Sequence, residues 1–163
     1  MRILVTGVRG FVGRHLAAAL TDAGHEVHGA VRPGQRAPEG ASSVEMDLAT
    51  RGWAMPDVDA VVHLAQANVS PVDAAGEMYA VNALATLGLL EDARACGAKR
   101  FILASSGAVY GSGGPFTETD RLSGDSFYAT TKVHAERFVE LHRDQMGTAV
   151  LRFFFPYGSG LPP

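Results

Sequence analysis

Two residues four positions apart, Tyr128 and Lys132, give the sequence its clearest potential for chemistry. In a helix this spacing places both side chains on one face, about 6 Å apart along the axis. An ammonium group beside a phenol favours the phenolate, so the pair predicts a tyrosine pKa lowered from about 10 towards neutral pH. Such a tyrosine can give or take a proton at a carbinol or carbonyl while a nicotinamide cofactor exchanges hydride.

A third candidate, Ser106, follows an apolar run at 99–104 that is expected to form a strand. Open α/β sheets bind ligands beyond the carboxyl ends of their strands, so this hydroxyl could hold a substrate oxygen. The alternative is purely structural: Ser106 caps a turn, Tyr128 packs in the interior and Lys132 is solvated.

A glycine-rich loop directly follows the first apolar run, with Gly7, Gly10 and Gly13 at its turn. Gly7 permits a tight turn, Gly10 lets the backbone approach a pyrophosphate, and Gly13 allows close packing of helix and strand. The helix that starts here offers free N–H groups and a partial positive charge to phosphates. The loop therefore predicts dinucleotide binding, and an ordinary structural turn is the alternative.

Strands and helices that could position these residues alternate along the whole chain. Apolar runs bounded by turn residues predict strands, and apolar residues at helical spacing predict helices. The strands are expected at 2–6, 26–31, 43–46, 59–65, 99–104 and 148–153, and the helices at 11–23, 72–96 and 127–146. This alternation predicts an α/β fold with a doubly wound parallel sheet, as one Rossmann domain over residues 1–163.

The composition narrows the possible functions. The 163 residues, 47% hydrophobic and 19% charged, suit one globular domain, and a net charge of −3 gives no support for nucleic-acid binding. The single cysteine, Cys96, and six histidines without ligand spacing predict no metal site. Without a signal peptide or a run able to cross a bilayer, a soluble, cytoplasmic protein is expected.

Several short stretches together resemble one family. They are Gly7-x-x-Gly10-x-x-Gly13, Asp47-Leu48, His63-Leu64-Ala65, Asn82, Ser105 to Gly111, Tyr128-x-x-x-Lys132, and Leu151 to Phe154. In this order they resemble the extended short-chain dehydrogenase/reductase family, in particular its NAD-dependent epimerase/dehydratase group, which acts on nucleotide sugars. The resemblance extends over essentially the whole chain.

The resemblance implies roles for individual residues. Ser106, Tyr128 and Lys132 match the family's catalytic triad, and Lys132 is also expected to touch the nicotinamide ribose. The expected cofactor contacts are Gly7, Arg9, Gly10, Phe11, Val12, Gly13, Arg32, Asp47, Leu48, Leu64, Ala65, Asn82, Tyr128 and Lys132. The family's usual proline before the tyrosine is replaced by Phe127, so the sequence defines the start of that helix less sharply.

The expected cofactor is NAD(P), with NADP slightly favoured. An NAD enzyme usually ends its second strand with a carboxylate that accepts the ribose 2′-hydroxyl, whereas this chain has Val31-Arg32 there. Arg9 is a second cation near the same ribose, and two guanidinium groups suit a 2′-phosphate. Stacking of Arg32 on adenine, with Arg9 merely exposed, is the alternative.

Two functions remain open from the sequence. The first is an NAD(P)-dependent epimerase or reductase acting on a nucleotide sugar or a related carbonyl compound. The second is an NAD(P)-binding module without turnover, because family members are about twice as long and their C-terminal lobe, which supplies most of the substrate pocket, is absent here. The resemblance also implies a homodimer formed through the helices at 72–96 and 127–146.

Overall fold

The structure is a computed structural model that describes residues 1–68 and 72–161. Its centre is one sheet of six strands, in which every neighbouring pair runs parallel. The strands are β1 (Arg2–Thr6), β2 (Glu26–Val31), β3 (Ala41–Glu45), β4 (Ala60–His63), β5 (Arg100–Ser106) and β6 (Gly147–Phe153). The order β3-β2-β1-β4-β5-β6 confirms the doubly wound fold, with its switch point between β1 and β4.

Helices connect most of the strands. They are α1 (Phe11–Asp22), α2 (Ala75–Tyr79), α3 (Ala85–Ala95) and α4 (Phe127–Leu141), with short 3-10 turns η1 (Val72–Ala74) and η3 (Gly107–Tyr110). None of the helices in the described ranges is long and apolar enough to cross a membrane.

Two expected helices differ from the structure. The helix expected at 72–96 is interrupted by a π-helical turn, η2 (Ala80–Leu84), which carries the buried Asn82. The helix expected at 127–146 ends at Leu141, because His142 and Met146 are buried and the turn between them leads the chain into β6. Helical periodicity alone did not indicate either change.

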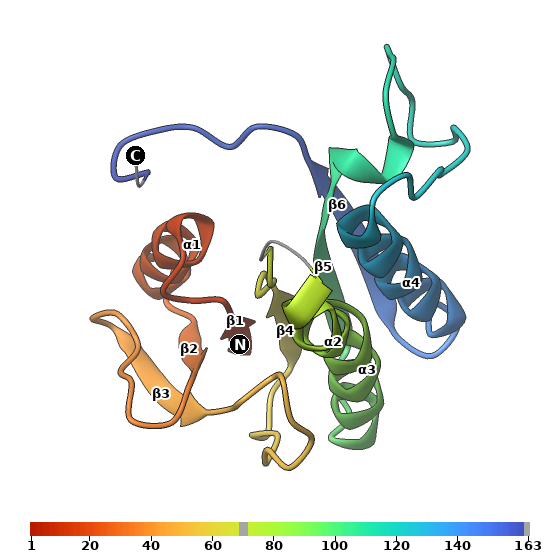
Figure 1. The fold of residues 1–163 in the computed structure, drawn as a ribbon. Coiled ribbons are helices and arrows are strands. Elements are labelled where there is room, and N and C mark those ends of the chain that lie inside the picture. Colours follow the sequence, from red (N-terminus) through yellow and green to blue (C-terminus); the bar gives the residue numbers. More distant parts are fainter. Residues whose placement is uncertain (69–71, 162–163) are drawn as a thin grey trace.

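The two faces of the sheet carry separate cores. Helix α1 packs on one face, where the core includes Ile3, Val5 and Ala17. Helices α3 and α4 cover the other face through a larger core that contains Leu89 and Phe101, and Figure 1 shows α1 on the opposite side of the sheet from these helices. In the described part of the chain, the α1 face is left partly uncovered near β5 and β6.

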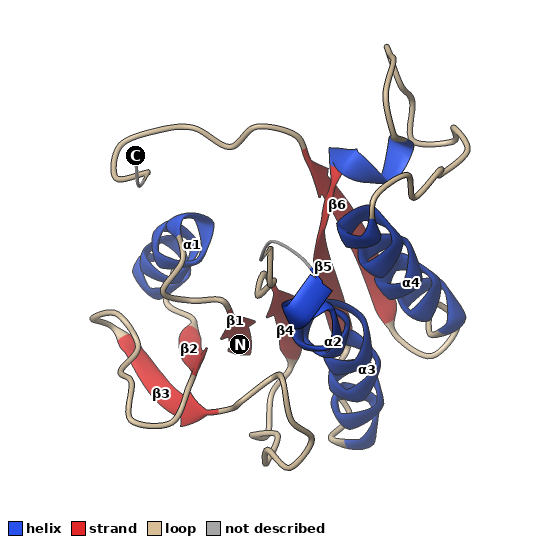
Figure 2. Cartoon of the chain, viewed as in Figure 1, coloured by secondary structure: helices blue, strands red, loops and turns tan. Residues whose placement is uncertain are grey.

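Two long segments reach the carboxyl ends of the strands. Figure 2 shows the loop between η3 and α4 projecting from the fold without a helix or strand. The chain after β6, residues 154–161, runs back to α1, where Arg14 donates to Gly160 O and His15 Nε2 lies 3.2 Å from Ser159 O. This C-terminal segment therefore crosses the edge of the sheet at which ligands bind.

Candidate functional site

The turn between β1 and α1 has no room for side chains at two of its glycines. Gly7 has a φ of +66°, and a Cβ there would lie 2.7 Å from Ala65 N. A Cβ on Gly13 would lie 2.1 Å from Gly7 O. Gly10 N donates to Gly7 O at 2.9 Å, which closes the turn at the N-terminus of α1. Backbone N–H groups at such a helix start suit a phosphate group.

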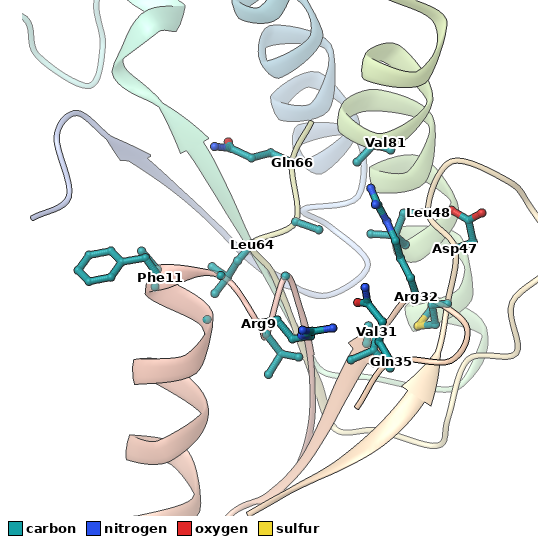
Figure 3. Close-up of a pocket in the computed structure, with 18 of the residues that line it drawn as sticks. Arg9, Phe11, Val31, Arg32, Gln35, Asp47, Leu48, Leu64, Gln66 and Val81 are labelled. Carbon is teal, nitrogen blue, oxygen red and sulfur yellow. The ribbon is translucent and has the colours of Figure 1, made fainter. Parts of the chain in front are cut away.

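A cavity of about 440 Å³ opens above this turn. Most of the expected cofactor contacts line it: Gly7, Arg9, Gly10, Phe11, Val12, Gly13, Arg32, Asp47, Leu48, Leu64 and Ala65. Figure 3 shows this cavity, which we call the cofactor cavity. The sequence did not indicate several further lining residues, among them Gln35, Met46, Gln66, Val81, Pro156 and Leu161.

Two arginines line the side of the cofactor cavity next to β2. Arg9 lies in the glycine turn and Arg32 directly after β2 (Figure 3). Arg32 Nη2 lies 3.8 Å from the Glu77 carboxylate, and both side chains are exposed. Asp47 lines the same cavity, where its Oδ1 accepts a hydrogen bond from Ala49 N at 3.0 Å. A ligand in this region therefore meets two guanidinium groups.

A second cavity, of about 260 Å³, adjoins the first beyond β4 and β5. We call it the tyrosine cavity, because Tyr128 and Ser106 both line it. The residues that line both cavities are Val12, Leu64, Gln66 and Pro156. The two cavities thus share a wall.

Tyr128 is held in a different way from the one that its spacing to Lys132 predicted. Its hydroxyl donates to Gln66 Oε1 at 2.7 Å. Burial raises the pKa of Tyr128, and hydrogen bonding to Ser106 offsets part of this rise. The expected lowering of the tyrosine pKa by Lys132 is therefore wrong for this structure, since burial has the larger effect.

The Lys132 side chain is buried and reaches the backbone of β5. Its buried Nζ donates to Ala104 O at 2.7 Å, at the end of β5. Burial lowers the pKa of Lys132 to about 8, although the Glu136 carboxylate opposes this change. Lys132 and Tyr128 share a face of α4, as expected, but Lys132 lines neither the cofactor cavity nor the tyrosine cavity.

His63 and Asn82 lie behind the cofactor cavity. His63 Nδ1 lies 2.6 Å from Thr6 Oγ1, which accepts from Ala65 N at 3.1 Å. Its Nε2 lies 3.1 Å from Thr86 Oγ1, which donates to Asn82 O. Burial lowers the pKa of His63 to about 3, so the ring is neutral and serves as a structural link.

The structure places Asn82 outside the wall of the cofactor cavity. Its side-chain amide is buried and pairs with the backbone of Ala67, accepting from Ala67 N at 2.7 Å and donating to Ala67 O at 2.9 Å. In this structure the amide supports the strand-to-loop segment that forms the cavity wall, and the direct cofactor contact expected of Asn82 stays a prediction.

These features define a class of protein. A doubly wound sheet, a glycine turn at a helix start and a cavity across the switch point characterise a dinucleotide-binding Rossmann domain. The tyrosine cavity beside it adds two hydroxyl groups that can bind or exchange protons. No group of three or more potential metal-ligating side chains occurs in the described residues.

Comparison with known proteins gives the family. Residues 3–163 match the model of the NAD dependent epimerase/dehydratase family, and the chain belongs to this family. UDP-glucose 4-epimerase from Erwinia amylovora is 30% identical over 98% of this chain and 54% of its own length.

Solved structures agree with this assignment. MoeE5 in complex with UDP-glucose and NAD has a TM-score of 0.87 and 32% identity, covering 100% of this chain and 57% of that chain. A short-chain dehydrogenase/reductase superfamily protein from Agrobacterium tumefaciens with bound NAD has a TM-score of 0.82 and 36% identity. The match covers 94% of this chain and 49% of that chain. The chain spans about half the length of the curated relatives it matches.

Proposed function

We propose that this chain forms the cofactor-binding half of an NAD(P)-dependent epimerase or reductase that acts on a nucleotide sugar. The observation that carries the proposal is the wall shared by the two cavities. The hydroxyls of Tyr128 and Ser106 line the tyrosine cavity on the other side of this wall, where a substrate carbon would have to meet a nicotinamide. The names of the relatives, UDP-glucose 4-epimerase among them, support the substrate class.

The residues present fit a dinucleotide. Gly10, the N-cap of α1, has no side chain at the cavity wall, which leaves backbone N–H groups as the surface that a pyrophosphate would meet. Leu48 and Val31 provide apolar walls near the two arginines. NAD(P), when bound, would supply hydride transfer at its nicotinamide.

The chain itself supplies proton transfer and binding. Tyr128 Oη carries the proton that would pass to or from the reacting substrate oxygen, and Ser106 Oγ would hold that same oxygen. Lys132, with a pKa of about 8, still carries its charge at neutral pH and would hold ribose hydroxyls after turning from Ala104 O.

Two substitutions test this function. We expect Gly10→Val to weaken NAD(P) binding at least about tenfold in calorimetric titration, since the side chain would occupy the phosphate approach. We expect Tyr128→Phe to abolish turnover of UDP-sugars in an active full-length protein while NAD(P) affinity changes little. Normal turnover by Tyr128→Phe would reject the acid–base role.

A second function, NAD(P) binding without turnover, is favoured by one observation. The sheet face beside α1 stays open near β6, where Leu151 is 47% exposed, and relatives are about twice as long. A substrate must be held about 3–3.5 Å from the hydride donor with water excluded. We therefore expect residues 1–163 alone to bind NAD(P) but turn over nucleotide sugars very slowly, whereas a longer chain or an added partner would restore activity.

A further inference from the structure

Gln66 occupies a special position in the wall between the cavities. Of the four residues that line both, Gln66 alone has a polar side chain. Its amide accepts the hydrogen bond of the Tyr128 hydroxyl, and its own side chain is exposed. Figure 3 shows the Gln66 side chain extending from the segment after β4. An amide is thus placed where cofactor and substrate would meet.

The backbone on both sides of Gln66 is fixed by buried side chains. Ala65 N donates to Thr6 Oγ1, which is hydrogen-bonded to the neutral His63 ring. Ala67 is bound through both its N–H and its C=O to the amide of Asn82. The backbone of Gln66 is thus held from both sides, which fixes the direction in which its side chain leaves the loop.

The same hydrogen bonds connect Gln66 with the helix turn that carries Tyr128. Asn82 Nδ2 also donates to Thr131 Oγ1 at 3.0 Å, and Thr131 Oγ1 donates to Tyr128 O at 2.7 Å. Asn82 therefore contacts both the loop of Gln66 and the first turn of α4. The separation between the amide and the phenol is set by this buried linkage and does not depend on their own hydrogen bond.

We propose that Gln66 is a positioning residue of the reaction, whose amide oxygen holds the Tyr128 hydroxyl as a neutral proton donor at the boundary of the two cavities. This inference rests on the proposed function, since it assigns the starting position of the same acid–base group. A substrate carbonyl oxygen entering the tyrosine cavity would replace the amide oxygen as acceptor. The tyrosine proton would then pass to that oxygen as hydride from reduced NAD(P) reaches the carbonyl carbon, which leaves a carbinol and a tyrosinate.

The environment of Tyr128 determines how this can be tested. Ser106 from β5 approaches the phenol, and Lys132, one turn further along α4, donates to Ala104 O. A phenol that donates to a carbonyl oxygen is stabilised relative to the phenolate, which cannot donate. Removing only the amide oxygen should therefore ease ionisation of Tyr128, and adding a negative charge at the same atom should oppose it.

The test is a tyrosinate absorbance titration of the cofactor-free full chain, with Tyr128→Phe used to isolate the signal of Tyr128. Gln66→Met preserves length and volume without an acceptor, and we expect it to increase the Tyr128 ionisation constant roughly tenfold. Gln66→Glu keeps the acceptor and adds charge, and we expect a decrease. Gln145→Met, on the exposed turn after α4, is the matched control and should leave the constant unchanged.

If both Gln66 variants ionise like the unmodified chain, or if Gln66→Met makes ionisation harder, the proposal is wrong. In the active full-length protein, the pH profile of kcat should shift in the same directions, which a merely structural effect would not produce. A chain that shows both titration shifts but binds no NAD(P) would support the Gln66 contact and overturn the proposed function.

Discussion

The buried side chain of His63 supports the wall of the cofactor cavity without lining the cavity itself. His63 has both ring nitrogens occupied by threonine hydroxyls, and one of these, Thr6, holds Ala65 in the cavity wall. Burial, together with the nearby Lys132 charge, opposes protonation of the His63 ring. Folding is thus coupled to the protonation state of a residue that lies outside the cofactor cavity.

This coupling predicts that stability falls in acid. Folded His63 stays neutral down to a pKa of about 3, whereas the unfolded chain protonates it below about 6.5. Between these values the unfolded state binds the extra proton, so the free energy of unfolding should fall as pH decreases, by up to about 1.4 kcal/mol per pH unit. Urea unfolding from about pH 7 to about pH 4 measures this slope.

Replacement of the ring isolates its contribution. His63→Gln cannot titrate, so its unfolding free energy should decrease less steeply with acid than that of the unmodified chain. His15→Gln, at an exposed position, serves as the control. NMR of the unmodified chain should also show a neutral His63 ring at about pH 5. A protonated ring at that pH would contradict the prediction.

The choice between NADP and NAD is predicted to depend on Arg32. If Arg9 and Arg32 receive a 2′-phosphate, Arg32→Asp should reverse a preference for NADP, because it adds repulsion and supplies an acceptor for a 2′-hydroxyl. We expect the ratio of NADP to NAD affinity to fall at least about tenfold in calorimetric titration.

A matched charge change checks this interpretation. Arg36→Asp, on the same exposed loop but outside the cavity wall, should leave the ratio nearly unchanged. An unmodified chain that already binds NAD far better than NADP would show that the two arginines have another role.

The sequence was informative about residues whose role depends on backbone geometry. Gly7 and Gly13 could be assigned to the turn because their spacing reflects a local steric requirement. Gln66 could not be found, since its importance arises from a contact with Tyr128, 62 positions away. The pKa of Tyr128 was predicted in the wrong direction because helical spacing indicates proximity to Lys132 but gives no information about burial.

At the level of elements, the junction of β1 and α1 is the most constrained part of the fold. A methyl group on Gly13 would collide with Gly7 O, which belongs to the backbone and cannot easily move. We expect Gly13→Ala to lower the free energy of unfolding by about 1–3 kcal/mol and to weaken NAD(P) binding. Thermal unfolding and calorimetric titration measure the two effects.

Another helical glycine provides the control. A Cβ added to Gly76 in α2 would meet no atom within 4 Å beyond its chain neighbours and the backbone of its own helix. Gly76→Ala should therefore be neutral or stabilising by up to about 1 kcal/mol, through helix propensity alone. Equal destabilisation by both substitutions would show that the close approach at Gly13 has no special effect.

Elements with strong local signals were predicted well, and their ends less well. The strands at 2–6 and 26–31 agree with β1 and β2, because an apolar run ends at a glycine or a polar turn. The π-helical turn at Ala80–Leu84 gave no such signal, since it serves the long-range pairing of Asn82 with Ala67. Tertiary hydrogen bonding overrode the regular helix that the local sequence favoured.

At the scale of the whole molecule, we expect two copies to associate through α3 and α4, as the family resemblance implies. A surface groove between these helices is lined by residues such as Leu87 and Leu141, and Leu84 is 48% exposed at the start of α3. A charge placed in an isologous apolar contact acts twice. Leu84→Glu should therefore shift the protein from dimer to monomer in sedimentation velocity.

Leu151 on β6 is a leucine of almost equal exposure, 47%, and provides the control. Leu151→Glu should leave the association state unchanged. An unmodified chain that sediments as a monomer at all concentrations would contradict the predicted dimer.

The segment that follows β6 has a consequence for the rate at which a bound cofactor would leave the cavity. Pro156 and Leu161 line the cofactor cavity, while Arg14 and His15 of α1 contact the backbone at Ser159 and Gly160. A dinucleotide in that cavity would lie beneath this stretch of chain and could exchange with solvent only when the contacts to α1 open. The residence time of the cofactor would then be set by this opening, whatever the strength of the contacts inside the cavity.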